Sequence, residues 1–334
     1  MENVTPLPFL SATEPRRPAP VAPAAESVEN VGGLARSAMR EQLDAIVALE
    51  PIVRIEGSPD AIHDMRVATR RLRATISLFK SALPVRAIRF RDELRWLGSA
   101  LGKVRDIDVQ REGLARWIDD AAGDERQGLR GIDELMAQRR AEAYERLLRT
   151  LDMRRYAHLK ESLEIFVRRA RASPNPAARM PAVVVMPELI AKRYRSVRKA
   201  GRKLGRSSDA AELHALRIRC KRLRYALEIV TPLYPDPAET LVKRLVRLQD
   251  VLGEIQDAEI AIEQMQELGR NTGRRLPTAA VFALGRVAER QHERAGGLRK
   301  RFPSTFAAIE GKRWKQLKRE MERRRAAGAV TIPS

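Results

Sequence analysis

The chain has 334 residues, 44% of them hydrophobic and 4% aromatic, and its 64 Lys and Arg against 43 Asp and Glu give a net charge of +21. This size suffices for one large domain or two ordinary ones. The charge predicts a polyanionic partner, namely nucleic acid, an anionic membrane or a phosphate polymer, although an arginine-rich proteome would account for part of it.

Cysteine content and apolar runs exclude several classes of protein. The single Cys220 excludes an intramolecular disulfide and a zinc cluster built on cysteines. The N-terminus lacks a basic stretch followed by an apolar run, which argues against a secretory signal. No segment approaches the ~18 consecutive apolar residues of a membrane-spanning helix, so we expect a cytoplasmic protein with no membrane span.

The chain divides into a leader, two helical halves and a tail. Residues 1–30 contain six prolines and show no periodicity, which predicts a disordered Pro/Ala-rich leader. The Pro-rich segment 173–181 is the natural joint between a first half, 31–172, and a second half, 182–310. Residues 311–334 are expected to form a basic C-terminal helix and tail.

Helical periodicity and Gly/Pro punctuation define the elements of both halves, and no alternating strand pattern of useful length is present. The fold class is therefore predicted to be all-α. The expected helices are 32–55, 59–82, 85–120, 125–149, 152–171, 184–205, 209–231, 237–268, 278–300 and 303–325.

One basic motif occurs twice. Residues 63–73 read HDMRVATRRLR and residues 214–224 read HALRIRCKRLR, 151 positions later. The offset holds without a gap over 63–106 against 214–257, with 12 identities in 44 positions. This internal duplication predicts two similar helical bundles, and the repeated cations predict that both bundles share one strongly anionic ligand.

A helical wheel separates each motif into a basic and an apolar side at ~100° per residue. The basic sides, here called the first and second stripes, contain His63, Arg66, Arg70 and Arg73, and His214, Arg217, Lys221 and Arg224. The apolar sides contain Met65, Thr69, Leu72, Ile76 and Phe79, and Leu216, Cys220, Leu223, Leu227 and Val230. Like charges at this spacing repel, and neither stripe contains a carboxylate, which favours binding of an external anion.

A second repeated signature follows in the next helix of each half, LGKVRDID at 101–108 and LGEIQDAE at 252–259. Glycine inside a helix costs ~1 kcal/mol relative to alanine. We interpret Gly102 and Gly253 as sites of close helix packing in preference to ligand contact. Asp106 and Asp257 either orient a histidine or arginine of the neighbouring helix, or form ordinary salt bridges.

These motifs, with HALRIRCKRLRYALE and LVRLQDVLGEIQDAE in the second half, resemble the conserved histidine α-helical domain, or CHAD, over about 31–310. The resemblance implies two helical bundles related by a pseudo-twofold axis. It also implies binding of inorganic polyphosphate in a basic cavity or groove, with polyphosphate granules as a location. By resemblance the binding residues are His63, Arg66, Arg70, Arg71, Arg73, His214, Arg217, Lys221, Arg222 and Arg224.

Neither catalysis nor a cofactor is expected. Many CHAD proteins carry a triphosphate tunnel (CYTH) domain with a Glu-x-Glu-x-Lys strand, and we expect none here, so hydrolase activity is not inferred. No nucleophile motif or phosphate loop is present. None of the four histidines has a metal-ligand residue at i+4, so a metal site is not expected, although a two-histidine site across the pseudo-twofold stays open.

Three alternatives remain open at this point. His63 and His214 are either conditional cations that gain a proton beside a polyanion or structural residues hydrogen-bonded at a bundle interface. A net charge of +21 also predicts non-specific nucleic-acid binding, although few aromatic side chains are available for base stacking. A granule-surface scaffold that recruits partners through the leader and tail is the third reading, and the oligomeric state is not predicted.

Overall fold

The computed structural model describes residues 30–168, 175–272 and 278–330, and this part of the chain is helical with no strand. The all-α prediction is thus confirmed. The helices are α1 (Val31–Ile55), α2 (Pro59–Leu78), α3 (Val85–Asp120), α4 (Gly123–Asp152), α5 (Arg154–Arg168), α6 (Pro176–Arg179), α7 (Ala182–Gly201), α8 (Ala210–Val230), the 3-10 turn η1 (Thr231–Leu233), α9 (Pro235–Thr272), α10 (Thr278–Ala307) and α11 (Lys312–Val330).

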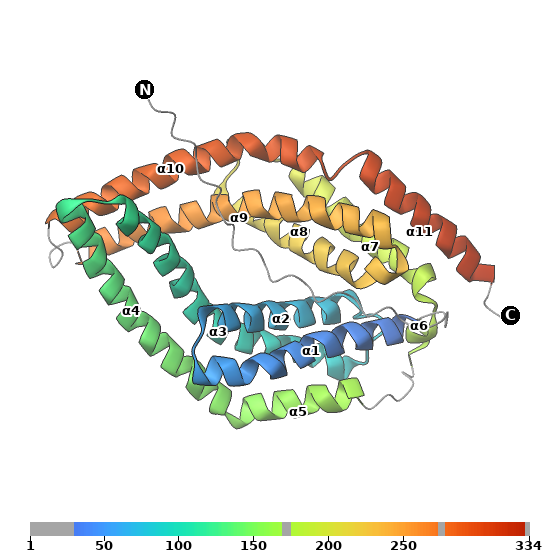
Figure 1. Ribbon diagram of the computed structural model, residues 1–334. Coiled ribbons are helices and arrows are strands. Elements are labelled where there is room, and N and C mark those ends of the chain that lie inside the picture. The colour runs from blue at the N-terminus through green and yellow to red at the C-terminus, as the bar shows by residue number, and fades with distance from the viewer. Residues whose placement is uncertain (1–29, 169–174, 273–277, 331–334) are drawn as a thin grey trace.

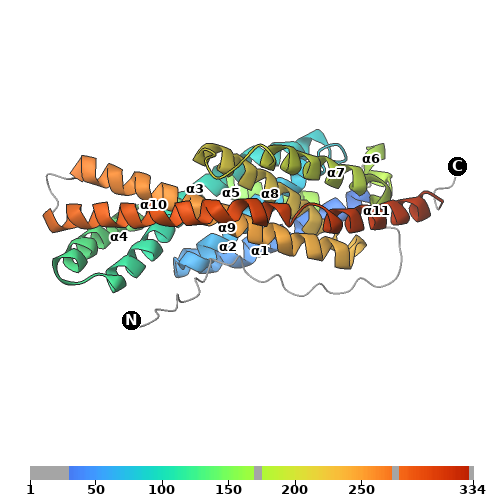
Figure 2. The ribbon, with the colours of Figure 1, turned by 90° about the horizontal axis from the view of Figure 1, so that it is seen from above.

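The helices form two layers that follow the two halves of the chain (Figure 1). In the first, α1 packs on α2 and α5, and α2 packs on α3. In the second, α7 packs on α8 and α11, and α8 packs on α9. The layers meet where α2 contacts α8 and again where α4 contacts α10. Seen from above, the molecule is elongated along α10 and α11 (Figure 2).

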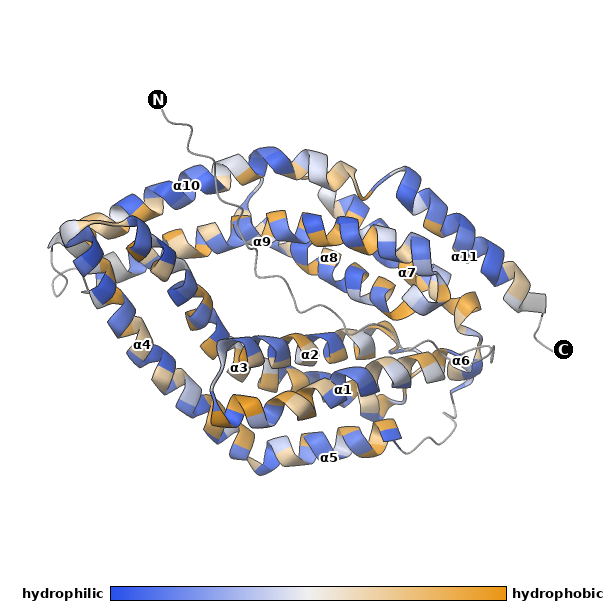
Figure 3. Cartoon of the chain, in the orientation of Figure 1, coloured by the Kyte–Doolittle hydropathy of each residue, from blue (hydrophilic) through white to orange (hydrophobic). Residues whose placement is uncertain are grey.

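Apolar stripes of the helices form the core, as the periodicity predicts. Met65, Leu72 and Ile76 of α2 are fully buried, as are Leu216 and Cys220 of α8. Figure 3 shows hydrophobic and hydrophilic residues interspersed along the helices. A second, smaller cluster joins the halves where α3 and α4 meet α9 and α10, and its buried members are Leu114, Ala121, Leu129, Ile132, Met136, Met265, Ala283, Leu284 and Val287.

The start of α2, which carries the first stripe, is set by local signals. Gly57 adopts a left-handed conformation with φ +58°, which disfavours any residue with a Cβ. Ser58 then caps the helix by accepting a hydrogen bond from the backbone N–H of Ala61 at 3.4 Å, and Pro59 occupies the first turn. These signals fix where the first stripe begins.

One predicted helix break is wrong. The expected helices 278–300 and 303–325 place a break just before Pro303, but α10 continues through this residue to Ala307, and the chain turns at Gly311 with φ +72°. Phe306 explains the difference, because its ring is buried against Gly201, where an added Cβ would lie 2.0 Å from the ring. This packing stabilises a helical turn that proline alone would disfavour. Residues 1–29 of the expected leader and residues 173–174 of the joint lie outside the described residues.

Candidate anion-binding site

The first and second stripes lie on helices that contact each other. α2 packs against α8, and across that contact Arg70 Nε donates a 2.8 Å hydrogen bond to Tyr225 Oη. Arg66 and Arg217 lie close enough to repel each other, and so do Arg70 and Lys221. Four members of the two stripes, Arg66, Arg70, Arg217 and Lys221, are therefore close together where the halves meet.

Lys221 is the cation most affected by this arrangement. Its side chain is half-buried, and its pKa falls to about 6, first because burial removes water from the ammonium group. Repulsion from Arg70, Arg217 and Arg66 lowers the pKa further, while Asp257 opposes the shift. A nearby anion would oppose this repulsion and favour the charged form of Lys221.

His63 lies in a similar environment at the start of the first stripe. The ring is half-buried, and within the described residues neither of its nitrogens has a hydrogen-bond partner. Burial lowers its pKa to about 4, and repulsion from Arg105, Arg70 and Arg66 contributes, with Glu112 opposing. Whether His63 and His214 become cations beside a bound anion or are structural residues stays a prediction.

Arg66 and Arg217 each lie over a glycine of the next helix. The nearest atoms to an ideal Cβ at Gly102 belong to the Arg66 guanidinium, and those at Gly253 belong to the Arg217 guanidinium. Arg66 Nη2 lies 3.5 Å from Asp106 Oδ1, so this carboxylate forms a salt bridge with an arginine of the neighbouring helix. Close packing at the two glycines is thus with an arginine side chain and not with helix backbone.

Arg71 and Arg224 lie at the same contact between α2 and α8, but both are paired with Glu228. Arg71 Nη2 is 3.4 Å from Glu228 Oε2, and Arg224 Nε is 3.5 Å from Glu228 Oε1. Both guanidiniums also lie over the Tyr225 ring. Arg224 is only 5% exposed, so the wheel was wrong to place it on an open face. A role for these two arginines in binding stays a prediction.

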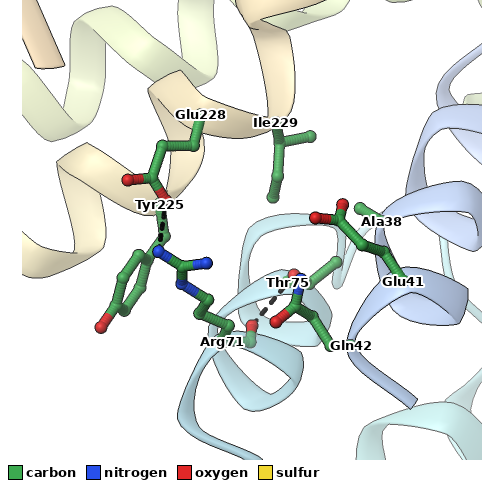
Figure 4. A pocket seen from close by; sticks show the side chains of 8 residues that line it. All are labelled: Ala38, Glu41, Gln42, Arg71, Thr75, Tyr225, Glu228 and Ile229. Atoms are coloured by element: carbon green, nitrogen blue, oxygen red, sulfur yellow. Dashed lines mark hydrogen bonds and ion pairs between the residues drawn. The ribbon is translucent and has the colours of Figure 1, made fainter. Parts of the chain in front are cut away.

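A small hollow borders this contact, between α1, α2 and α8 (Figure 4). Its lining includes Arg71 together with the carboxylates Glu41 and Glu228, as well as Gln42 and Tyr225. Arg71 points toward Glu228 and not into open space. Two carboxylates make this hollow a poor site for a polyanion, which separates it from the opposed stripes.

The positive charge extends beyond the stripes to arginines that the repeat did not reveal. Burial lowers the pKa of Arg73, and repulsion from Arg95, Arg91 and Arg222 lowers it further. Burial and repulsion from Arg222 likewise lower the pKa of Arg193 on α7. We define the cation cluster as Arg66, Arg70, Arg73, Arg91, Arg95, Arg105, Arg193, Arg217, Lys221 and Arg222. Arg105 contributes charge from a buried position, because it is paired with Glu112 at 2.6 Å.

The residues missed by sequence reasoning have no cationic counterpart in the other half. Positions 151 residues after Arg91, Arg95 and Arg105 are Val242, Val246 and Gln256. A comparison of the two copies therefore could not identify these arginines, because only one copy has a cation at each position. The only available signal was the i, i+4 spacing of Arg91 and Arg95 on α3, a helix that was already predicted to pack beside the first stripe.

The described residues offer neither a metal site nor a membrane span. Across 30–168, 175–272 and 278–330 there is no group of three or more His, Cys, Asp or Glu side chains placed to hold a metal ion. Within the same ranges no helix has the length and apolar character needed to cross a membrane. The main chemical feature of the candidate site is therefore its cluster of positively charged side chains.

Comparisons with known proteins bear on this arrangement. The CHAD domain model matches residues 37–266. The chain is 29% identical over 249 residues to two uncharacterized proteins of Mycobacterium tuberculosis, MT2285 and Rv2226. The match covers 70% of this chain and 46% of each relative, so the chain spans about half the length of the curated relatives it matches.

Two solved structures share the fold. The crystal structure of the CHAD domain from the plant Ricinus communis has a TM-score of 0.72 at 25% identity and covers 87% of this chain and 96% of its own. PptA from Streptomyces chartreusis has a TM-score of 0.67 at 20% identity, with coverage of 83% and 99%. The fold described above is therefore that of known helical structures over most of its length.

Proposed function

Because this chain belongs to the CHAD domain family, a family known to bind polyphosphate, we propose that it binds inorganic polyphosphate without hydrolysing it. The ligand lies between α2 and α8 and is held by the cation cluster of both halves. Polyphosphate granules are the location that this activity implies.

The main observation behind the proposal is that positively charged side chains from the two halves lie close together and repel each other. Burial lowers the pKa of Arg66 and of Lys221, and repulsion from Arg70 of α2 and Arg217 of α8 lowers both pKa values further. Such repulsion destabilises the free protein and has no structural benefit, whereas an anion between the helices reverses the field. Unfavourable pKa shifts gathered at one place are typical of functional sites.

The chemistry of the cluster suits phosphate oxygens better than bases. Arginine presents a planar fork of donors that matches phosphate geometry, and nine of the ten cluster residues are arginines. Tyr225, the aromatic side chain at the α2–α8 contact, is 4% exposed and covered by Arg70, Arg71 and Arg224. It offers no open face for base stacking, which single-strand binders use.

Non-specific nucleic-acid binding is the second candidate, and one observation favours it. α11, with the sequence KRWKQLKREMERRRAAGAV, carries eight Lys and Arg against two Glu and lies on the outside of the second layer (Figure 1). Charge outside the cluster would attract any polyanion in a salt-dependent way. The two candidates therefore differ in whether binding depends on the cation cluster or on the outer surface.

Competition at a fixed salt concentration tests the proposal. Labelled long-chain polyphosphate is bound to the protein at 150 mM salt and displaced by unlabelled polyphosphate or by duplex DNA, at equal concentrations of phosphate. We expect polyphosphate to displace the label at concentrations at least about tenfold lower, because base-independent contacts to DNA weaken steeply at this salt. Equal displacement by both would contradict the proposal, and so would release of orthophosphate from bound chains by a pure preparation.

A further inference from the structure

Gly102 and Gly253 occupy matching places beneath the two opposed arginines. An ideal Cβ at Gly253 would lie 3.0 Å from Arg217 Nη2, and one at Gly102 would lie 3.4 Å from Arg66 Nε. The two glycines are 151 residues apart, as are the two arginines. Both glycines are buried within long helices, α3 and α9.

The helices themselves do not require glycine at these positions. Neither residue has the positive φ that Gly57, Gly123 and Gly311 adopt. At both positions the three nearest atoms beyond the helix's own backbone belong to the arginine, so no neighbouring helix backbone demands the space. A mid-helix glycine destabilises the helix by ~1 kcal/mol relative to alanine. The guanidinium group that lies over each position therefore explains why both residues are glycine.

We infer that Gly102 and Gly253 are positioning residues, which let Arg66 and Arg217 lie flat on α3 and α9 so that a polyphosphate anion meets their guanidinium groups at a fixed place. This inference rests on the proposed function. A guanidinium already held in place loses less rotamer freedom when it binds phosphate, which increases affinity.

The contacts of Arg217 restrict where its guanidinium group can lie. Nη1 donates a 3.1 Å hydrogen bond to Gln256 Oε1 on α9, one turn of helix beyond Gly253. Nε is buried and, within the described residues, has no hydrogen-bond partner. A methyl group at position 253 would push the guanidinium off α9 by a few tenths of an ångström and strain the bond to Gln256. At Gly102 the 3.4 Å distance is an ordinary contact, so a methyl group there disturbs Arg66 less.

Alanine substitutions with matched controls test the inference. G253A and G102A are compared with G285A and G131A, two helical glycines at which an added Cβ meets nothing within 4 Å. We expect G253A to raise the Kd for length-defined polyphosphate on the order of fivefold and G102A to raise it less, because a loosely held binding group loses affinity. The controls should bind as the wild type does. All four variants should unfold at or above the wild-type temperature, because alanine favours helix.

A double-mutant cycle between Gly253 and Arg217 separates positioning from a general structural effect. In an R217A background, G253A should have no further effect on the Kd, because the side chain that it displaces is gone. Additive effects would overturn the inference, and the cycle decides the matter even if G253A lowers the unfolding temperature. If the wild type binds polyphosphate and G253A binds it equally well, the inference fails while the proposed function stands. If the wild type does not bind, both fail.

Discussion

Replacing Arg66 and Arg217 together by glutamate is expected to weaken binding of long-chain polyphosphate about 100-fold or more. A hydrogen bond to a charged group contributes about 1.5–3 kcal/mol, and each tenfold change in Kd corresponds to about 1.4 kcal/mol. Each reversal also places a carboxylate beside the ligand. Because the two side chains come from opposite halves and lie close enough to repel each other, the double variant should lose more than either single variant.

A matched control separates the site from net charge. Arg149 on α4 and Arg195 on α7 have side chains that are 63% and 61% exposed and lie outside the cation cluster. R149E/R195E changes the net charge by the same amount as R66E/R217E. We expect the control to bind within about threefold of the wild type at 150 mM salt, because exposed charges are screened there. Equal losses in both double variants, at unchanged helicity, would show that binding follows total charge and not the opposed stripes.

Binding is also expected to take up protons, so that affinity rises as pH falls. In the free protein Lys221 has a pKa of about 6 and His63 a pKa of about 4. Phosphate oxygens favour the charged forms and raise both pKa values in the complex. By linkage, affinity increases as pH decreases from the bound pKa to the free pKa of each group. The gain from Lys221 is therefore complete near pH 6, while the gain from His63 continues toward pH 4.

Lys221→Arg isolates the lysine contribution. Arginine keeps its charge across this range, so K221R should bind more tightly than the wild type at pH 8 and show a flatter pH dependence between pH 8 and 6. His63→Gln should flatten the dependence below pH 6 without abolishing binding. Calorimetry at pH 7 in buffers of different ionisation enthalpy measures the protons taken up. A wild-type heat that is independent of the buffer would contradict this prediction, as would a K221R variant with an unchanged pH slope.

Most of the fold could be predicted because its signals are local. The apolar faces of α2 and α8, the cap at Ser58 and the glycine and proline residues between helices are each visible within a short window of sequence. The break between α10 and α11 could not be predicted in this way. It depends on how Phe306 packs on Gly201, more than 100 residues away, and that contact overrides the local signal of Pro303.

The candidate site was predictable in its position but not in its details. The repeat identified the opposed cations Arg66, Arg70, Arg217 and Lys221, because both copies kept them. It could not show that Arg224 is buried against Glu228, since that depends on how the halves dock. It also grouped Lys221 with the arginines, although burial lowers the pKa of Lys221 and repulsion from Arg70 and Arg66 of the other half lowers it further.

The central claim is that one polyphosphate chain lies between α2 and α8 and contacts both halves. A crystal structure of the full chain with a length-defined polyphosphate tests this most directly. We expect phosphate oxygens within hydrogen-bond distance of Arg66 and Arg70 from the first half and of Arg217 and Lys221 from the second. A chain bound only along the outer surface of α11, with the opposed stripes unoccupied, would contradict the claim.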